Sequence, residues 1–562
     1  MPFVWPKAAA LVFPEAEQDR LSARGAGAVV LAAFLLTAAG LTLHLAWRPD
    51  FNKNSVDGFY YATLAQNLAA GRGYTTGAFP QTLYYPLYPI AIAAVYLAIG
   101  RVELAAHLVN VLALGVYAFF TYALLRRIFA RRDLAAAGVV LSLAAPDLLY
   151  HSSLMITEAL FCALLSAAAY TALGLAERPE TESGRAHWLL LGALGGLLYL
   201  TRPEAIAYLG AIGAYLIARR PRWREAANWA VAAAAFLICV SPWVIYLSRL
   251  NHTFTFFGKA AINLDIGAMR GGNRGINVAH IFNAPAADGT GVRLEEPEKF
   301  GRLATAADNW FAYPRHLAEH LRRLERLAGF AGLLLPLGIL FFLVRRRGWQ
   351  LLYLAALAAV QLAIPFYFSE PRFVTQAIPF VIAVELAGGV QLAVWLLSRA
   401  GRPALAAAAA ITLTAALLAP IAARHYGFYF AREPEFERQQ REMRALAADA
   451  AQEGVDLRGR QVIAYRPWFA FYTGAVHREM PNYAAPDELP RYLARNRIPF
   501  LLLSRLGDND LSLDYRAIAA DPAAFGLHLV AARSEFLLLR AQNDNSERER
   551  SRGAKDDAAP SS

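Results

Sequence analysis

Long apolar segments separated by short polar loops are the main pattern along the chain. Many windows of about 18 or more residues are nearly free of charge, which is the length that a helix needs to cross a bilayer. The first such segment, residues 26–47, follows Lys7, Arg20 and Arg24. A signal peptide has a shorter apolar core and a small-residue cleavage site behind it, so we interpret this segment as a retained anchor. The pattern predicts an all-α polytopic membrane protein.

The basic residues between the apolar segments predict which loops face the cytoplasm. Residues 1–25 and the arginine cluster at 126–132 should both lie inside, which requires two crossings between them. Pro86–Gly100 is short for a span and has two prolines in its first turn, so we expect it to dip into the membrane or to lie along its outer side. The alternation of apolar segments with inside and outside loops predicts about eleven spans. They are 26–47, 103–125, 134–150, 158–176, 187–201, 205–218, 226–247, 327–344, 350–368, 374–398 and 403–423.

The character of the sequence changes after the last apolar segment. Residues 425–545 carry more charge, with short strand-like runs at 461–465, 498–504 and 535–540 and a helix-like stretch, DELPRYLARN, between them. These features predict a small extracytoplasmic α/β domain. The expected divisions are a cytoplasmic N-terminus (1–25), a transmembrane domain (26–424) with outer loops at 48–102 and 248–325, the α/β domain (425–545) and a disordered tail (546–562).

Composition agrees with a membrane protein and narrows the possible partners. The chain is 57% hydrophobic and 18% charged, which is too apolar for a soluble protein of this length. Its net charge of +11 would allow nucleic-acid binding, but the arginines mostly punctuate apolar segments, so we interpret them as topology signals. We expect membrane lipids as partners and no nucleic acid. Cys162 and Cys239 each lie inside an apolar segment, which indicates neither a disulfide framework nor a metal site.

The stretch Asp57–Pro89 is polar, aromatic and rich in turn residues, although it directly follows the first span. Apolar positions recur at helical spacing and predict a short amphipathic helix: Tyr61, Leu64, Ala65 and Leu68. Gly71 and Gly73 can end this helix, because glycine adopts positive φ without a Cβ clash. Asp57 therefore lies at the start of a helix on the outer face. Two interpretations stay open at this point: Asp57 caps backbone N–H groups, or its carboxylate has a chemical role.

Other polar groups are expected at the same depth on the same side of the membrane. They are Glu158, Arg202 with Glu204, and Glu370 with Arg372. Each alone has a structural explanation, because an acid favours a helix N-terminus and an arginine can anchor at the headgroups. Together they would line a cavity, since ionisable residues at membrane depth usually face one. Arginine forks hold phosphate and a carboxylate can take a proton, so the set favours an anionic lipid-linked substrate.

Two further features stay open. The run MRGGNRGIN at 269–277 is either a phosphate-binding nest of backbone N–H groups or a flexible glycine loop. Glu385 lies in the middle of a span with no evident partner. It is a functional candidate or a neutral, hydrogen-bonded packing residue.

The motifs also resemble a known family. The run D-x-x-Y-Y-x-x-x-A-x-N-L-A-x-G-x-G-Y from Asp57, followed by Y-P-L-Y-P, is similar to the first outer loop of GT-C glycosyltransferases. The branch is dolichyl-phosphate-mannose–protein mannosyltransferase-like and includes bacterial lipid A aminoarabinose transferases. Later landmarks match in order over about residues 26–400: LMITEALF (154–161), LTRPEA (200–205) and SEPRFVTQAIPF (369–380). The outer C-terminal domain matches only in character.

The resemblance implies an inverting enzyme of the cell (inner) membrane that takes a sugar from a polyprenyl-phosphate donor. An extracytoplasmic lipid, glycan or protein would accept the sugar. The family's base falls on Asp57 and its second acid on Glu158, while Tyr60, Tyr61, Arg202, Glu204, Glu370 and Arg372 would bind substrate. Gly58 departs from the family's Asp-Glu pair, which leaves open a second carboxylate and a divalent cation. The alternative is a transporter or flippase of lipid-linked sugars with the same acids as proton sites, although no related broken-helix halves are evident.

Overall fold

The computed structural model describes residues 21–541 apart from several gaps. The gaps are 50, 54, 77–78, 179–183, 220–224, 259–301, 346, 367–369, 403–404, 432–434, 465–466, 480–492, 495 and 505–514. The chain divides into two compact units. The first comprises 1–52, 82–273 and 303–432, and the second comprises 53–81, 274–302 and 433–562. The α2 segment, expected as part of an outer loop of the membrane domain, therefore groups with the C-terminal domain.

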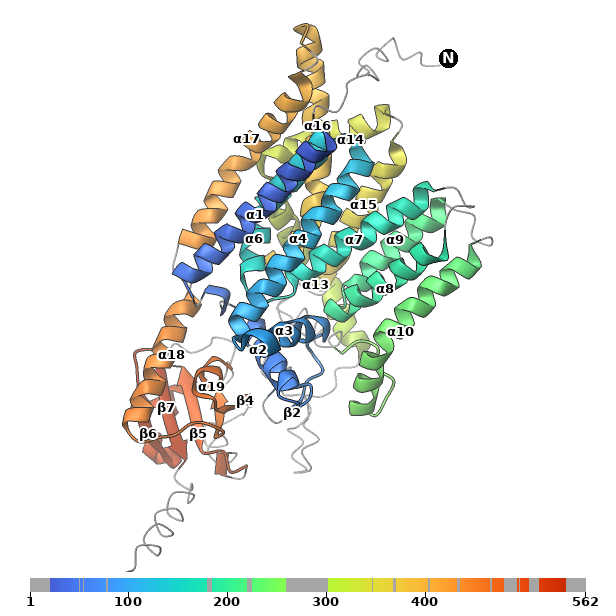
Figure 1. Ribbon diagram of the computed structural model, residues 1–562. Coiled ribbons are helices and arrows are strands. Elements are labelled where there is room, and N and C mark those ends of the chain that lie inside the picture. The colour runs from blue at the N-terminus through green and yellow to red at the C-terminus, as the bar shows by residue number, and fades with distance from the viewer. Residues whose placement is uncertain are drawn as a thin grey trace, which may run out of the picture. The chain divides into compact units, whose positions relative to one another are not determined.

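The first unit is a bundle of helices (Figure 1). Its α-helices are α1 (Ala23–Trp47), α3 (Leu87–Ile99), α4 (Val102–Phe129), α5 (Arg132–Leu143), α6 (Pro146–Ser153), α7 (Glu158–Glu177), α8 (Arg185–Thr201), α9 (Ala205–Arg219), α10 (Ala226–Leu250), α13 (Arg302–Ala328), α14 (Leu335–Val344), α15 (Gly348–Ala363), α16 (Ile378–Arg399) and α17 (Ala406–Tyr426). Short 3₁₀ or π turns are η2 (Phe51–Lys53), η4 (Gly329–Leu334), η5 (Ile364–Phe366), η6 (Pro371–Ala377) and η8 (Gly427–Ala431). All-helical structure in the apolar part of the chain is confirmed.

Every apolar segment expected to cross the membrane overlaps a helix. By length and composition, 7 of the described helices can cross a membrane, or up to 9 if each bent pair is one span. The other two expected spans are α8 and α9, whose 17 and 15 residues are shorter than the roughly 20 that a bilayer core requires. The count of eleven stays a prediction. Side chains such as Leu36 and Ile238 are 74% and 72% exposed, as expected where the surrounding medium is lipid.

Two elements interrupt the bundle where proline and glycine occur. The 13 residues of α3 make a helix of about 20 Å, too short to span, and Figure 1 shows it transverse to α4. Gly100, in the left-handed region at φ 71°, ends this helix. The pair α5 and α6 bends by 55°, because Pro146 lacks an N–H and holds Ala145 in an extended conformation.

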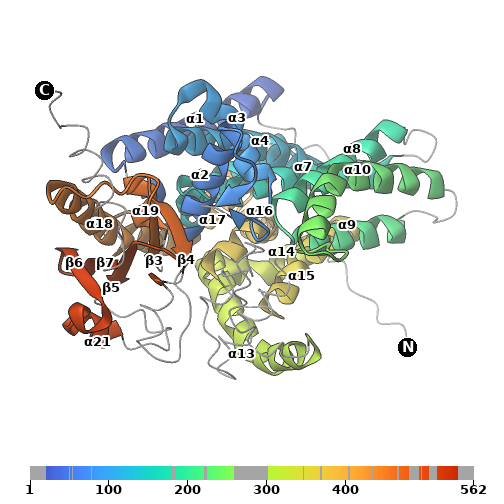
Figure 2. The same cartoon turned by 90° about the horizontal axis from the view of Figure 1, so that it is seen from below.

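The second unit contains a mixed five-stranded sheet in the order β4-β3-β5-β7-β6 (Figure 2). The strands are β3 (Gln461–Ala464), β4 (Val476–Glu479), β5 (Phe500–Ser504), β6 (Leu527–Ala532) and β7 (Phe536–Ala541). β3 pairs in parallel with β4 and β5, whereas β7 is antiparallel to β5 and β6. The remaining elements are α2 (Val56–Ala69), a two-stranded hairpin of β1 (Thr75–Thr76) and β2 (Phe79–Pro80), α18 (Glu435–Gln452), α19 (Trp468–Thr473), α21 (Tyr515–Ala520) and η9 (Pro522–Phe525).

The α/β character of the C-terminal domain is confirmed. The three expected strands correspond to β3, β5 and β7, while β4 and β6 were not predicted. Alternate side chains of β3 and β5 enter two different buried clusters, with Val462 and Phe500 in one and Ile463 and Leu501 in the other. Strands buried on both faces read as continuous apolar runs, which is why they were recognisable. The expected helix DELPRYLARN falls largely outside the described residues.

Candidate functional site

Glu158 is the centre of a buried charge cluster in the first unit. Arg202 Nη1 donates to Glu158 Oε1 over 2.5 Å, and Arg372 Nε lies 3.9 Å from the same oxygen. Glu158 is 0% and Arg202 7% exposed. The pair is therefore shielded from water, where an ion pair interacts strongly but its desolvation is costly.

Two more carboxylates complete the cluster, each within two positions of an arginine along the chain. Arg202 Nη2 and Nε donate to the two carboxylate oxygens of Glu204 over 3.3 and 3.4 Å. Arg372 Nε lies 2.9 Å from Glu370 Oε2. The five expected residues of this group thus come together, joined by ion pairs.

Helix ends and turns hold these side chains in place. Glu158 is the first residue of α7, where the helix dipole favours a negative charge. Arg202 directly follows α8 in extended conformation, and Glu204 lies in the turn before α9. Glu370 directly precedes η6, and Pro371 occupies the first position of this helix. The fixed φ of Pro371 suits a helix start, and Arg372 follows as the second residue of η6. Four separate elements therefore present their charged ends to one point.

The segment that leads to Glu158 is held by the buried side chain of Asn110 and by one backbone hydrogen bond. Asn110 donates from Nδ2 to the backbone oxygens of Ser152 and Leu154 over 2.9 and 2.6 Å, and its Oδ1 accepts from Tyr88 over 3.1 Å. The backbone N–H of Met155 donates to the backbone oxygen of Asn52 over 3.0 Å. This segment has no regular helix, so these bonds to other parts of the chain replace the helical hydrogen bonds that it lacks.

The charge balance distinguishes the two arginines. Burial alone would lower the pKa of Arg202, but the carboxylates of Glu204 and Glu158 outweigh it and hold this pKa above its ordinary value. All three guanidinium nitrogens of Arg202 (Nε, Nη1 and Nη2) donate to carboxylate oxygens. The Arg372 side chain is 21% exposed, and its guanidinium carbon lies 5.6 Å from the ring centre of Phe373. Arg372 is therefore the more accessible cation.

The first-loop residues lie in the second unit. α2 begins at Val56, so Asp57 is its second residue, and the N-cap position is Ser55, whose side chain makes no capping bond. Asp57 is half-buried, whereas Tyr60 and Tyr61 are 5% and 7% exposed. The predicted helix is confirmed. An acid in the first turn suits the helix dipole whether or not it has a further role.

Several buried polar residues near the cluster were not predicted. His151 Nδ1 lies 2.7 Å from the backbone oxygen of Asp147 and 3.3 Å from Thr375 Oγ1, one turn of η6 after Arg372. Gln376 is 1% exposed, and neither of its amide atoms has a hydrogen-bond partner among the described residues. In a 3₁₀ helix the residues i and i+3 lie on the same side, so Gln376 shares the side of Phe373. Its only sequence signal was its place in SEPRFVTQAIPF.

Glu385 differs from the cluster acids. It is 0% exposed in α16, and among the described residues neither carboxylate oxygen has a hydrogen-bond partner. Both cysteines are free thiols, with Cys162 buried in α7. The run MRGGNRGIN lies outside the described residues.

A divalent cation does not fit the three carboxylates of this cluster. Glu158, Glu204 and Glu370 are each paired with an arginine, whereas a hard cation takes several oxygens unopposed by other cations. In the part of the chain that the structure describes, no group of three or more His, Cys, Asp or Glu could hold a metal ion.

Comparison with known proteins identifies the fold. A model of the family "Dolichyl-phosphate-mannose-protein mannosyltransferase" matches residues 84–246, and no curated protein matches the chain in sequence. The structure of ArnT from Cupriavidus metallidurans bound to undecaprenyl phosphate is similar at a TM-score of 0.55 and 14% identity, covering 92% of this chain and 98% of that one.

Two archaeal structures are similar as well. AglB, the oligosaccharyltransferase from Archaeoglobus fulgidus, was solved with an inhibitory peptide and a dolichol-phosphate; the TM-score is 0.52 at 10% identity, covering 84% of this chain and 69% of AglB. An Archaeoglobus fulgidus oligosaccharyltransferase complex with Zn and sulfate gives 0.54 at 14% identity, covering 85% and 68%. The resemblance to GT-C glycosyltransferases is confirmed, and at these identities the likeness establishes a shared fold.

Proposed function

We propose that this protein is an integral-membrane glycosyltransferase that moves a sugar from a polyprenyl-phosphate donor to an acceptor on the extracytoplasmic face. The observation that carries the proposal is the buried cluster of Glu158, Arg202 and Arg372 in a GT-C fold. A fold alone does not imply an activity, whereas a buried, charged cluster assembled from four elements indicates a functional site.

The donor phosphate is the group that Arg372 suits best. A guanidinium fork matches phosphate oxygens, and Arg372 is more accessible than Arg202. Its partner Glu370 is also partly exposed, at 24%, so a phosphate can take the place of this carboxylate at little cost. Arg202, bound to two acids, would mainly hold Glu158 in place.

Asp57 would act as the base. The acceptor hydroxyl oxygen attacks the anomeric carbon, and the bond from this carbon to the phosphate oxygen breaks. Its electron pair leaves with the polyprenyl phosphate, while the hydroxyl proton passes to the Asp57 carboxylate. A single displacement inverts the anomeric configuration. A positioned base contributes roughly 10²–10⁴-fold to such a step.

The other predicted residues keep proposed roles in the reaction. Glu158 is the second acid of the proposal, and Tyr60, Tyr61, Glu204 and Glu370 are proposed to contact substrate.

Transport of lipid-linked sugars is the second candidate. The fully buried Glu385 in α16 favours it, because an intramembrane acid without a hydrogen-bond partner among the described residues can serve as a proton site. The cluster at Glu158 favours transfer, since its carboxylates are held by arginines rather than poised for proton exchange.

The test is sugar transfer by the purified full-length protein in detergent. Synthetic polyprenyl phosphates carrying different radiolabelled sugars serve as donors, with a crude membrane extract as the acceptor source. We expect label to move to an acceptor from at least one lipid-linked donor and from no nucleotide sugar. Transfer without a lipid-linked donor, or none from a broad donor panel, would contradict the proposal. Movement of the donor across a vesicle membrane without transfer would support the transporter.

A further inference from the structure

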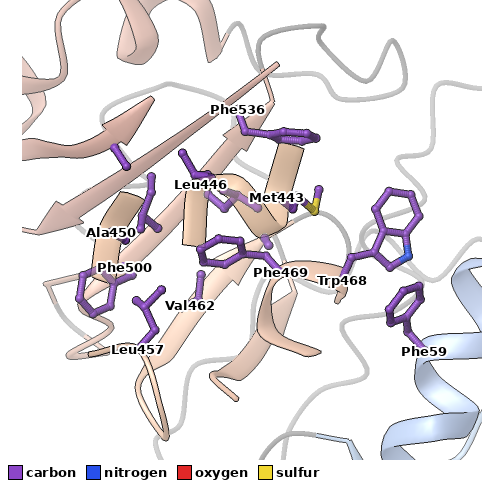
Figure 3. Close-up of a cluster of buried hydrophobic side chains, with 14 residues drawn as sticks. Phe59, Met443, Leu446, Ala450, Leu457, Val462, Trp468, Phe469, Phe500 and Phe536 are labelled. Atoms are coloured by element: carbon purple, nitrogen blue, oxygen red, sulfur yellow. The ribbon is translucent and has the colours of Figure 1, made fainter. Parts of the chain in front are cut away.

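The main contact of the helix that carries Asp57 with the C-terminal α/β domain is one buried aromatic side chain. Phe59, two residues after Asp57, is 0% exposed and belongs to the same buried cluster as the core of that domain. Figure 3 shows its ring directed at Trp468. We propose that the α/β domain is a positioning domain for Asp57 and that Phe59 is the positioning residue. This inference rests on the proposed function.

Three rings of α19 surround Phe59. Their centres lie 5.9 Å (Trp468), 5.1 Å (Phe471) and 6.0 Å (Tyr472) from the centre of the Phe59 ring. Positions i, i+3 and i+4 share one face of a helix, so α19 presents all three rings together. The contacts with Phe471 and Tyr472 are edge-on, at 86° and 79°, which is a favourable arrangement for aromatic pairs.

α19 is itself fixed to the domain. Tyr472 donates its hydroxyl to Gln440 Oε1 of α18 over 2.7 Å, and the guanidinium carbon of Arg444 lies 5.2 Å from the Tyr472 ring centre. Gly474, in the left-handed region at φ 70°, ends α19 two residues before the start of β4. The aromatic site for Phe59 is thus bonded to α18 of the same domain.

A second contact lies on the same side of α2 as Asp57. Tyr60 is one helical turn from Asp57, so the two share a face, and its ring centre lies 6.5 Å from that of His477 in β4. α2 needs such support, because a helix of 14 residues is marginal by itself. Its orientation, and with it the direction of the Asp57 carboxylate, follows from this packing.

The test compares variants of the full-length protein that weaken the α/β domain in different places. Phe59→Ala and Trp468→Ala remove the anchor, whereas Leu446→Ala makes a cavity in the same cluster at a point that Figure 3 shows away from Phe59. We expect the anchor variants to lose kcat about 10²-fold, as a misplaced catalytic group does, with donor KM within twofold. Leu446→Ala should lower thermal stability comparably and keep kcat.

Two more measurements make the outcome decisive. The double variant Phe59→Ala/Trp468→Ala should lose no more kcat than either single variant, because both remove one contact, and Phe59→Leu should recover part of the loss. Hydrogen exchange of the α2 amides should accelerate in Trp468→Ala and not in Leu446→Ala, whether or not sugar is transferred. Unchanged α2 exchange in Trp468→Ala, or equal loss of kcat in Leu446→Ala, would overturn the inference. A parent protein without activity that still shows the exchange difference would refute the proposed function alone.

Discussion

Arg202 and Arg372 approach the same oxygen of Glu158 but differ in their other partners. Arg202 is enclosed by two carboxylates, and removing one partner of a buried pair usually costs about 3–5 kcal/mol because the other charge stays buried. Arg372 and its partner Glu370 are both partly exposed, so the loss of their ion pair should cost less than the loss of a fully buried pair. We infer a mainly structural role for Arg202 and a binding role for Arg372.

Replacing either arginine with lysine tests these two roles separately. Arg372→Lys keeps the charge but loses the fork, so donor KM should rise about tenfold or more while the unfolding temperature changes little. Arg202→Lys should lower stability by about 1–3 kcal/mol, because carboxylate oxygens lose donors in a buried place. Donor titration and thermal unfolding measure the two effects.

Arg533 provides a matched control. It holds Asp449 through two bonds of 2.6 Å in the α/β domain, so Arg533→Lys also loses a fork but should leave donor binding unchanged. Normal donor binding by Arg372→Lys would exclude Arg372 from the phosphate site.

Asp57→Asn tests the base. Asparagine has nearly the same size and accepts a hydrogen bond but cannot take up the proton, so kcat should fall about 10²–10⁴-fold. Stability should fall by no more than about 1 kcal/mol, the usual value of an acid in the first turn of a helix. Single-turnover transfer, donor binding and thermal unfolding give the three values. Turnover within a few-fold of the parent would show that Asp57 has only a structural role, and Glu158 would become the candidate base.

At the scale of elements, close helix contacts hold the framework behind the cluster. A Cβ at Gly338 would lie 2.0 Å from the backbone oxygen of Val384, and one at Gly388 would lie 2.0 Å from that of Leu334. α14 and η4 therefore pack directly on the backbone of α16, which follows η6 and its Arg372 without a break. A shift of α16 would displace the cluster as well.

Gly388→Ala tests this contact. The added methyl group must push the helices apart, and overpacking typically costs about 1–3 kcal/mol. The unfolding temperature should fall, and donor affinity should fall with it. Gly210→Ala is the control, because nothing lies within 4 Å of a Cβ there and alanine favours a helix. Equal stability of the two variants would show that α16 can move without cost.

At the scale of the whole molecule, the orientation in the membrane stays a prediction. The cysteines Cys162 and Cys239 are first replaced by alanine, and single cysteines are then placed at Ile90 in α3, Gly184 before α8 and Leu529 in β6. Ile90 and Leu529 are exposed, at 49% and 55%. A membrane-impermeant maleimide should label positions 90 and 529 from outside and position 184 only after permeabilisation. Labelling of position 90 from the cytoplasmic side would contradict the expected placement of Pro86–Gly100.

Much of the helical architecture could be predicted because the membrane imposes it locally. Backbone N–H and C=O groups in lipid must form hydrogen bonds within their own segment, so a long apolar run such as 26–47 is expected to form a helix. β3, β5 and β7 could be predicted for a different reason, because their burial on both faces of the sheet leaves continuous apolar runs. β4, with the sequence VHRE, is an edge strand and carries no such run, so only its neighbour β3 determines it.

The candidate residues were recognisable from the sequence, but their roles were not. Spacing and motif pointed to Glu158, Arg202, Glu204, Glu370 and Arg372 without indicating which of them pair. The ion pairs join residues as far apart in the chain as Glu158 and Arg372, more than two hundred positions, and local sequence carries no signal for such distances. No periodicity distinguishes His151 or Gln376, and Gln376 is marked only by its place in SEPRFVTQAIPF, because a buried polar residue is recognised only once its neighbours are known.

By itself, the sequence determined the helices, the α/β character of the C-terminal domain and the position of Asp57 in the first turn of a short helix. These follow from hydrophobic periodicity and turn residues, which act over a few positions. Only the tertiary structure decided that Arg202 is enclosed while Arg372 is accessible, and that Phe59 joins α2 to the C-terminal domain. In the sequence, Phe59 is not distinguishable from other apolar residues. Its partner Trp468 lies more than four hundred positions away, and only packing in three dimensions brings the two rings together.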